Sequence, residues 1–414
     1  MKRKTVAWGK TPWTIAFRAK KGRLPEKVDV AIVGGGFTGL AAAAMVKRLA
    51  PKKSVLVLEA ERVGNGASGR TGGMVLAETA AGNLPGLGDV LKGYRKILRV
   101  LSVKADLQLP GVWELARGPR SMEGKPVHAI EHSPIEWDDL GQLRAVKKVP
   151  GGSLNPGKLV SGLARAAVKA GAQIAEHTTV EKLEFDDPVR LRVHRQRPGA
   201  SRMEQVVAAE QVLIATNAGS VELGDELFVG REPAEPKLTF ALATARLGKK
   251  QLRNIGFGSG RPFYTVDLPY LWGRLLEHGR LIFGSGLVPG WGESMREKSR
   301  MKKAAKFSKE RIWTGLEKVD VRKGEAAERL ASLEKRVRAL HPVLEKIRVT
   351  HRWGGPILLT REFMPVFRRH PHSAKVIVSG GYSGHGVALS VYLGARAARV
   401  MVGKFPREWE LKRR

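Results

Sequence analysis

The chain has 414 residues, of which 43% are hydrophobic and none is cysteine. This length is sufficient for two domains, and the lack of cysteine excludes disulfides, a thiolate nucleophile, thiolate metal sites and a thioether link to a cofactor. The 73 lysines and arginines outnumber the 39 aspartates and glutamates, which gives a formal net charge of +34. Because these basic residues are spread along the whole chain, we read them mostly as a solvated surface bias, with nucleic acid as the less favoured partner.

No apolar run reaches the ~18 residues that a membrane-spanning helix needs. The basic N-terminus is not followed by the apolar segment of a signal peptide. We therefore expect a cytoplasmic protein without a transmembrane segment. Residues 1–27 combine many basic residues with Trp8, Trp13 and Phe17, which predicts an irregular arm whose aromatic side chains dock on the body of the protein.

Residues 28–59 have the pattern of a βαβ dinucleotide-binding unit. An apolar strand precedes the glycines of GGGFTGL, an alanine-rich helix follows them, and a second strand over residues 54–58 ends at Glu59. In this pattern Gly34 permits the tight turn, Gly36 allows the backbone to approach a pyrophosphate, and Gly39 lets the helix pack closely on the sheet. The first helical turn, with Phe37 and Thr38, offers unpaired N–H groups to phosphates, and Glu59 is placed to bind a ribose.

A second glycine-rich stretch, residues 60–74, follows directly. It has five glycines and no apolar period, so we expect a loop that approaches a ligand rather than a packed element. Its predicted cofactor contacts are Ala60, Arg62, Ala67, Ser68, Gly69, Arg70, Thr71, Gly72, Gly73 and Met74.

The middle of the chain is predicted to contain both helices and strands. A helix is predicted over residues 90–103, and another begins at Asn155 as the cap, with Pro156 in its first turn, and ends at Gly171. Strands are expected at residues 173–175, 178–183 and 212–215. Short β-like runs at 238–244, 263–266, 268–272 and 280–284 predict an antiparallel sheet, and two helices are expected within residues 296–340, the second stopped by Pro342.

The C-terminal part repeats the geometry of the beginning. An apolar strand at residues 376–379 leads into GGYSGHG and then into a helix over residues 387–402, which Gly403 terminates. The N-terminus of this helix also directs partial positive charge towards a ligand.

The motifs GGGFTGL, LEAERVGNGASGRTGGM and GGYSGHG together resemble the D-amino-acid-oxidase-like (DAO) family of FAD-dependent oxidoreductases. Within this family the chain is most similar to the γ-glutamylputrescine-, sarcosine- and glycine-oxidising enzymes, and the first of these have a GASGR-x-GG loop of this form. The resemblance implies an α/β fold, with a Rossmann-like FAD-binding domain of the glutathione-reductase type and an inserted antiparallel-sheet substrate domain. The implied division is a basic arm at 1–27, FAD-binding parts at 28–82, 151–222 and 341–405, substrate or cap parts at 83–150 and 223–340, and a basic tail at 406–414.

The resemblance also implies cofactor contacts and chemistry. The further contacts are Val180, Thr216, Asn217, Ala218, Gly381, Tyr382, Ser383, Gly384, His385 and Gly386. The implied reaction is oxidation of the C–N bond of an amine or amino acid by hydride transfer to flavin N5, which gives an imine that hydrolyses. No metal site is predicted. We expect FAD to be non-covalent, because there is no cysteine and the first histidine, His128, lies beyond the N-terminal loops.

Five residues are candidates for the substrate side. His385 could hydrogen-bond the flavin or keep the amine deprotonated, and Arg70 could pair with a flavin carbonyl or a substrate anion. Arg274 and Tyr270 could bind a carboxylate, and Trp353 could wall the pocket. Glu362 stands where the family usually has aspartate, a departure from the family pattern on the substrate side.

Two questions stay open at this stage. The electron acceptor is O2, a quinone or another carrier; Ile282, or a neighbour, occupies the strand position of the lysine that promotes the oxygen reaction in sarcosine oxidases, which favours a dehydrogenase. The alternative functions are a flavin-dependent tRNA-modifying oxidoreductase, a nucleic-acid-associated flavoprotein that uses the +34 charge, and a flavoprotein without catalytic activity.

Overall fold

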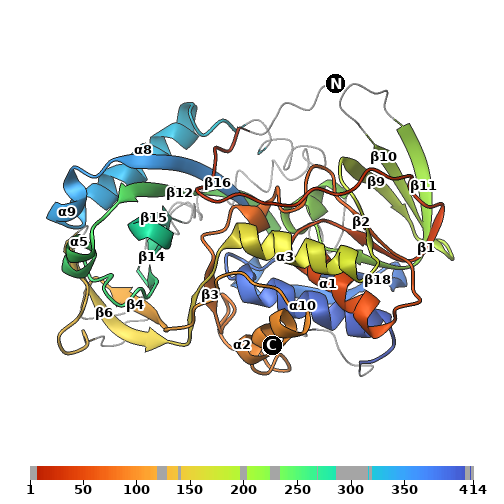
Figure 1. Cartoon of the computed structure of the whole chain (residues 1–414), viewed down its shortest axis with the longest axis horizontal. Helices are drawn as coiled ribbons and strands as arrows, with labels where there is room; N and C mark the ends of the chain where they lie inside the picture. The colour runs from red at the N-terminus through yellow and green to blue at the C-terminus, as the bar shows by residue number, and fades with distance from the viewer. Residues whose placement is uncertain are drawn as a thin grey trace, which may run out of the picture.

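The computed structural model describes residues 7–118, 128–138, 141–195, 203–223, 234–267, 269–285, 316, 319–405 and 411. The helix expected around residues 298–312 lies outside these ranges, as does nearly all of the predicted basic tail. Within the described part, two large sheets lie side by side and helices cover each of them (Figure 1).

The first sheet contains the predicted βαβ unit. Its order is β17-β18-β11-β1-β2-β8. The bounds are β1 Lys27–Val33, β2 Val55–Leu58, β8 Gln173–Ala175, β11 Met203–Ile214, β17 Val366–His370 and β18 Ser373–Gly380. Strands β18, β11, β1, β2 and β8 pair in parallel, as a Rossmann-like sheet requires.

Four helices lie on one side of this sheet and share one apolar core (Figure 1). They are α1 Phe37–Leu49, α2 Val90–Val100, α3 Pro156–Lys169 and α10 Gly386–Met401. The opposite face packs against β9 Thr178–Glu184 and β10 Val189–Arg195, which extend from β11 as an antiparallel ribbon. The core of the first sheet is thus apolar on both faces, which explains the continuous apolar runs in its strands.

The second sheet has the order β16-β12-β15-β14-β13-β4-β6-β5. The bounds are β4 Val112–Ala116, β5 Glu136–Asp138, β6 Gln142–Val149, β12 Ala234–Arg246, β13 Phe263–Thr265, β14 Trp272–Leu275, β15 Arg280–Ser285 and β16 Val349–Thr360. One face packs on α5 Lys249–Asn254, α8 Gly324–Ala339 and α9 Pro342–Glu345. The other face meets the cofactor loops described below.

Several sequence-based boundaries differ from the structure. Strand β16 belongs to the second sheet, although residues 341–405 were assigned to the FAD-binding part, and α2 packs on α10 although it falls in the predicted cap region. The strand expected at 268–272 is β14, which begins only at Trp272. Pro342 does not only end a helix: it is the first residue of α9, where its missing N–H costs nothing.

The loop at residues 60–74 is more ordered than its composition predicts. It contains a 3-10 turn, Ala67–Gly69, and ends in β3 Met74–Leu76, which pairs with β7 Gly151–Ser153. The expectation of no packed element was wrong because backbone hydrogen bonds, such as Gly69 N–H to Gly64 O at 2.9 Å, replace the missing apolar contacts.

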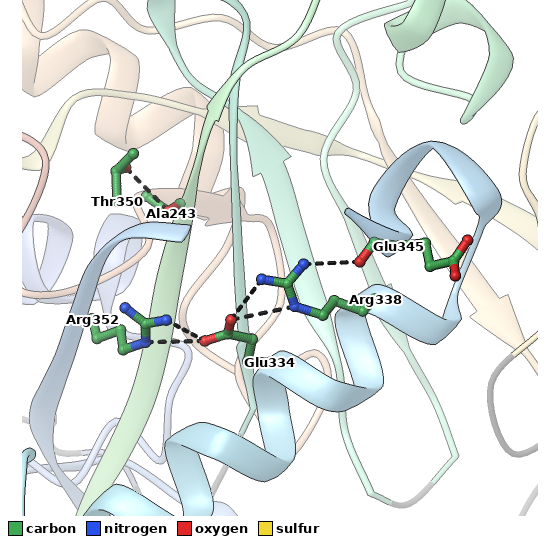
Figure 2. Close-up of polar contacts among 6 residues, drawn as sticks. All are labelled: Ala243, Glu334, Arg338, Glu345, Thr350 and Arg352. Carbon is green, nitrogen blue, oxygen red and sulfur yellow. Dashed lines mark hydrogen bonds and ion pairs between the residues drawn. The ribbon is translucent and has the colours of Figure 1, made fainter. Parts of the chain in front are cut away.

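A charged cluster fixes α8 to the edge strand β16 (Figure 2). The Glu334 carboxylate accepts hydrogen bonds from Arg338, at 2.8 Å, and from Arg352 of β16, and Arg338 also donates to the carbonyl of Glu345 at 2.8 Å. Although burial acts to raise it, these two guanidinium groups hold the pKa of Glu334 below its ordinary value. None of the described helices is long and apolar enough to cross a bilayer.

Candidate cofactor and active site

A groove opens at the carboxyl ends of β1 and β2, where dinucleotides bind in this kind of sheet. Its lining comes from four predicted segments and from the N-terminal arm. The lining residues that the sequence predicted are Gly34, Gly36, Glu59, Ala60, Ala67, Ser68, Val180, Thr216 and Asn217. Trp8, Glu61 and Gly64 also line the groove and were not predicted.

Two glycines of the first motif are required by close contacts. Gly34 has φ +110, and a Cβ at this position would lie 2.7 Å from the carbonyl oxygen of Ala215. A Cβ at Gly39 would lie 2.0 Å from the carbonyl oxygen of Gly34 and 3.0 Å from Cγ2 of Ile32. The tight turn and the close helix–strand packing that the motif predicts are therefore present.

The helices that begin at the two glycine motifs are not capped by their own N-cap side chains, although the Ser68 hydroxyl accepts a hydrogen bond from Phe37 N–H of α1 at 2.9 Å. Gly36 precedes α1 and His385 precedes α10, and neither caps its helix with a side chain. By contrast, Asp89 caps α2 and Asn155 caps α3, each with a hydrogen bond to a backbone N–H. Because helix N-termini carry unpaired N–H groups and partial positive charge, the two helices that begin at the glycine motifs suit an anionic ligand such as a pyrophosphate.

Glu59 lies at the end of β2 and faces the groove. Its carboxylate accepts hydrogen bonds from the backbone N–H groups of Gly35 at 2.7 Å and Glu61 at 2.9 Å. Burial raises the pKa of Glu59 to about 7, although these two hydrogen bonds oppose the rise. This position and its remaining acceptor capacity fit the ribose hydroxyls that the motif predicts.

The C-terminal glycine loop is joined to the N-terminal half of the site by side chains. The Asn217 side chain accepts a hydrogen bond from Gly381 N–H at 2.9 Å. The Tyr382 hydroxyl lies 2.7 Å from the Thr38 hydroxyl and 3.0 Å from that of Ser379. Ser383 has φ +47, and its hydroxyl lies 3.1 Å from that of Thr360 on β16. The two glycine motifs, far apart in the sequence, therefore form one site.

Three buried side chains hold carbonyl groups of the glycine loop. The indole N–H of Trp13 donates to Gly69 O at 2.8 Å, and that of Trp353 donates to Arg70 O at 2.9 Å. The guanidinium of Arg274, from β14, donates to Gly72 O. The loop is thus fixed by both the arm and the second sheet.

Arg70 contacts backbone carbonyls and an aromatic ring. Its guanidinium donates to Asn65 O at 3.1 Å and to Gly9 O at 3.0 Å, and it lies 5.4 Å from the centre of the Trp8 ring. Desolvation lowers the pKa of Arg70 to about 10 and that of Arg274 to about 9, so both remain cationic at neutral pH.

The remaining substrate-side candidates lie in different surroundings. His385 is half-buried at the start of α10, and burial lowers its pKa, which favours the neutral imidazole at neutral pH. Tyr270 is 38% exposed, and its carbonyl accepts a hydrogen bond from Arg336. Trp353 is buried and packs edge-on against Trp13, with ring centres 5.6 Å apart.

Other predicted contacts support the groove from below or lie beside it. Phe37, Thr38 and Ala218 are buried under it, Met74 lies in β3, and Arg62 is exposed. Among the described residues, no group of three or more histidines, aspartates and glutamates is arranged to hold a metal ion.

The predicted docking of Trp13 on the body of the protein is confirmed, but sequence reasoning missed its partner and missed Trp272 and Glu176. Trp272 packs its ring against Gly72, Trp13 holds Gly69, and the buried Glu176 accepts a hydrogen bond from Val63 N–H at 2.9 Å. Alternation along β14 offered one signal, because Trp272 and Arg274 share a face. The partners of Trp13 and Glu176 depend on the path of the arm, which no local pattern shows.

Comparisons with known proteins agree with this site. The family model for FAD-dependent oxidoreductases, DAO, matches residues 29–400. A probable oxidoreductase, OrdL, of Haemophilus influenzae is 26% identical over 91% of this chain and 84% of its own length. The γ-glutamylputrescine oxidoreductase of Escherichia coli is 25% identical over the same shares. The crystal structure of glycine oxidase from Geobacillus kaustophilus is 20% identical, with a TM-score of 0.66 over 94% of this chain and 100% of that one.

None of these comparisons supports the tRNA-modifying alternative. The glycine cradle, the N-terminus of α1 and the carboxylate of Glu59 all fit the ADP part of FAD. The family match and this geometry agree: the chain belongs to the DAO family of FAD-dependent oxidoreductases.

Proposed function

We propose that this enzyme oxidises the C–N bond of an amine or amino acid on the face of the second sheet that meets the glycine loop. FAD, when bound, supplies the acceptor for the hydride that leaves the substrate carbon. The substrate amine must be neutral at that moment, and the imine product reacts with water to give a carbonyl compound and an amine. The residues of the chain bind and orient the substrate, and they control the protonation of its amine.

A row of side chains in register carries this proposal. Glu114 of β4, Tyr264 of β13 and Trp272 of β14 are successive cross-strand partners. Residues that oppose one another across strands lie on the same side of a sheet. Since the ring of Trp272 packs on Gly72, the row leads directly from the cofactor loop to Tyr264, whose hydroxyl donates to Glu114 at 2.8 Å.

The charges beside this row match a substrate that has an amine. Glu114 provides a carboxylate for an ammonium or N–H group, and Arg274 provides a buried guanidinium on the same side of β14. Arg274, with Tyr270, and Arg70 are the proposed partners of a substrate carboxylate. His385, as a neutral imidazole, is suited to accept a hydrogen bond from the substrate amine and keep it deprotonated. Trp353 and Trp272 are the proposed walls of the pocket.

The residue at the strand position that promotes the oxygen reaction in sarcosine oxidases favours a dehydrogenase. Ile282 is fully buried on β15 and opposes Arg274 across the strands. Ile282 itself supplies no cation to stabilise reduced oxygen, and the guanidinium of Arg274 is engaged with Gly72 O, so we infer that a quinone or another carrier accepts the electrons.

The test is steady-state turnover of the FAD-loaded protein with a panel of amines and amino acids. Oxygen consumption and reduction of a soluble quinone are measured separately. Quinone reduction that greatly exceeds oxygen consumption supports the proposal. Faster turnover with oxygen would overturn the acceptor assignment, and no turnover with either acceptor would count against amine oxidation.

A further inference from the structure

The N-terminal arm binds the open edge of the second sheet. Gly9 forms an antiparallel bridge with Trp353 of β16, and the carbonyl of Trp8 accepts a hydrogen bond from Gly354 N–H at 2.8 Å. An edge strand offers such unpaired backbone groups. Gly9 has φ +77, and a Cβ there would lie 2.1 Å from the carbonyl oxygen of Arg352, so only glycine fits.

From this edge the arm runs to the glycine loop and holds it at two places. Trp13 donates its indole N–H to Gly69 O, while Glu176 accepts hydrogen bonds from Ala19 N–H at 3.1 Å and from Val63 N–H at 2.9 Å. Between these points Ile15 packs on Gly69, where an added Cβ would lie 2.7 Å from its Cδ1. The arm therefore fixes the loop from Val63 to Gly69.

Trp13 and Trp353 act on successive carbonyl groups, those of Gly69 and Arg70. Their rings meet at 82°, and both side chains are buried, with 9% and 1% of their surface exposed. Because both carbonyls point to the indoles, the orientation of the peptide planes next to the groove is set by the arm and by β16 together. Trp8, from the same arm, lines the groove itself, and the guanidinium of Arg70 lies over its ring in a cation–π contact.

We propose that residues 7–19 are a wall of the FAD site and that Trp13 is a positioning residue, which holds the glycine loop in the conformation that binds FAD. The family match begins at residue 29, so this wall lies outside the part that defines the family. The proposal concerns cofactor binding alone and does not depend on the identity of the substrate.

The test compares the FAD dissociation constants of the apo forms of four variants with that of the unchanged protein. W13F keeps a ring but removes the N–H that Gly69 O needs. Its matched control is W113F, because Trp113 is 8% exposed and its indole N–H makes no hydrogen bond with the residues that the structure describes. G9A blocks docking of the arm without touching the groove. Its control is G260A, since Gly260 also has positive φ but has open space around it.

W13F and G9A are expected to weaken FAD binding about tenfold. In W13F the buried carbonyl of Gly69 loses its donor, and in G9A the arm that carries Trp13 no longer docks on β16. W113F and G260A should stay within about twofold of the unchanged protein. Circular dichroism and the melting temperature of each apo form report on folding independently. Unchanged FAD affinity in both W13F and G9A would overturn the proposal, as would an equal loss in each variant and its control. If the unchanged protein binds FAD but oxidises no amine, the proposed function fails and this inference stands.

Discussion

The hydroxyl oxygens of Tyr382 and Thr38, which are 344 residues apart in the sequence, lie 2.7 Å apart beneath the cofactor groove. This contact joins the C-terminal glycine loop to the first turn of α1. It explains how a cofactor site built from both ends of the chain is held as one unit.

Removal of the Tyr382 hydroxyl should weaken both the fold and the cofactor site. Y382F leaves the buried hydroxyl of Thr38 short of a partner, so we expect the free energy of unfolding to fall by about 1–2 kcal/mol and FAD affinity to fall several-fold. Burial raises the pKa of Tyr382 to about 12, so the effect should not change between about pH 6 and 9. The control is Y392F, which removes a hydrogen bond to Leu87 O outside the site and should leave FAD affinity unchanged. A similar FAD loss in both variants would contradict the assignment.

Gly39 should tolerate no side chain. In G39A the new methyl group would press on Gly34 O and on Ile32, and α1 would have to move away from the glycine turn. We expect FAD binding to be weakened at least about a hundredfold, since the turn and the helix N-terminus together form the pyrophosphate site. G118A is the control, because a Cβ at Gly118 meets no atom within 4 Å and Gly118 does not line the groove. Equal FAD titrations for the two variants would show that the close packing is not needed.

Glu59 should make FAD binding depend on pH. The ionised carboxylate is the form that accepts hydrogen bonds from ribose hydroxyls, and the pKa of Glu59 in the free protein is about 7. Below about pH 7 a proton must leave before FAD binds, so affinity should fall by up to tenfold per pH unit. E59Q should bind more weakly at pH 8 and show a flatter profile. A profile of unchanged slope in E59Q would assign the titration to another group.

The same shift predicts a trend in the stability of the apo protein. Because the folded-state pKa of Glu59 is raised above the ordinary 4.5, folding favours the protonated form. This contribution is fully present at acid pH and is lost as pH rises towards about 7. Urea unfolding of apo E59Q should therefore lack this component of the pH dependence, and an identical pH curve would contradict the raised pKa.

The contribution of Glu334 to stability should depend on pH in the opposite direction to that of Glu59. Its pKa is lowered by Arg338 and Arg352, so its contribution to stability is present at neutral pH and is lost as pH falls through the lowered folded-state pKa (Figure 2). E334Q should reduce the free energy of unfolding by about 1–3 kcal/mol at pH 7 and by less in acid. E325Q, which removes an exposed pair with Arg329 on the same helix, should cost less than about 0.5 kcal/mol. Equal losses would show that the Glu334 cluster adds nothing beyond a surface pair.

Glu114 offers a kinetic test of the proposed substrate face. E114Q can still accept the hydrogen bond from Tyr264 but lacks the negative charge. The value of kcat/KM for an amine substrate should therefore fall about ten- to a hundredfold, mostly through a higher KM. FAD affinity should not change. Kinetics equal to those of the unchanged enzyme would place substrate binding elsewhere.

The sequence was most informative where chemistry depends on short local patterns. The glycines at 34 and 39, the capping role of Asn155 and the strand that ends at Glu59 all occur as predicted, because turn geometry, helix capping and a βαβ unit are each set within a few residues. The cofactor followed from two such patterns at opposite ends of the chain, and the family match confirms FAD.

Long-range contacts were not predictable in the same way. Nothing local shows that Trp13 reaches Gly69 or that β16 pairs with β12, because these contacts depend on where the whole chain passes. The sequence predicts Arg70 and Arg274 as ligands for anions, which stays a prediction; the structure shows both donating hydrogen bonds to backbone carbonyls. These carbonyl partners are brought together where the two sheets contact each other, and the periodicity of the sequence does not predict that contact.

Anaerobic mixing of the FAD-loaded enzyme with a panel of amines and amino acids tests amine oxidation most directly, because it isolates transfer from the substrate and needs no electron acceptor. The account predicts that at least one amine bleaches the visible flavin absorbance in a single turnover and that E114Q requires a higher concentration of that amine. Persistence of the oxidised flavin spectrum with every amine, in a preparation whose flavin dithionite reduces fully, would contradict it.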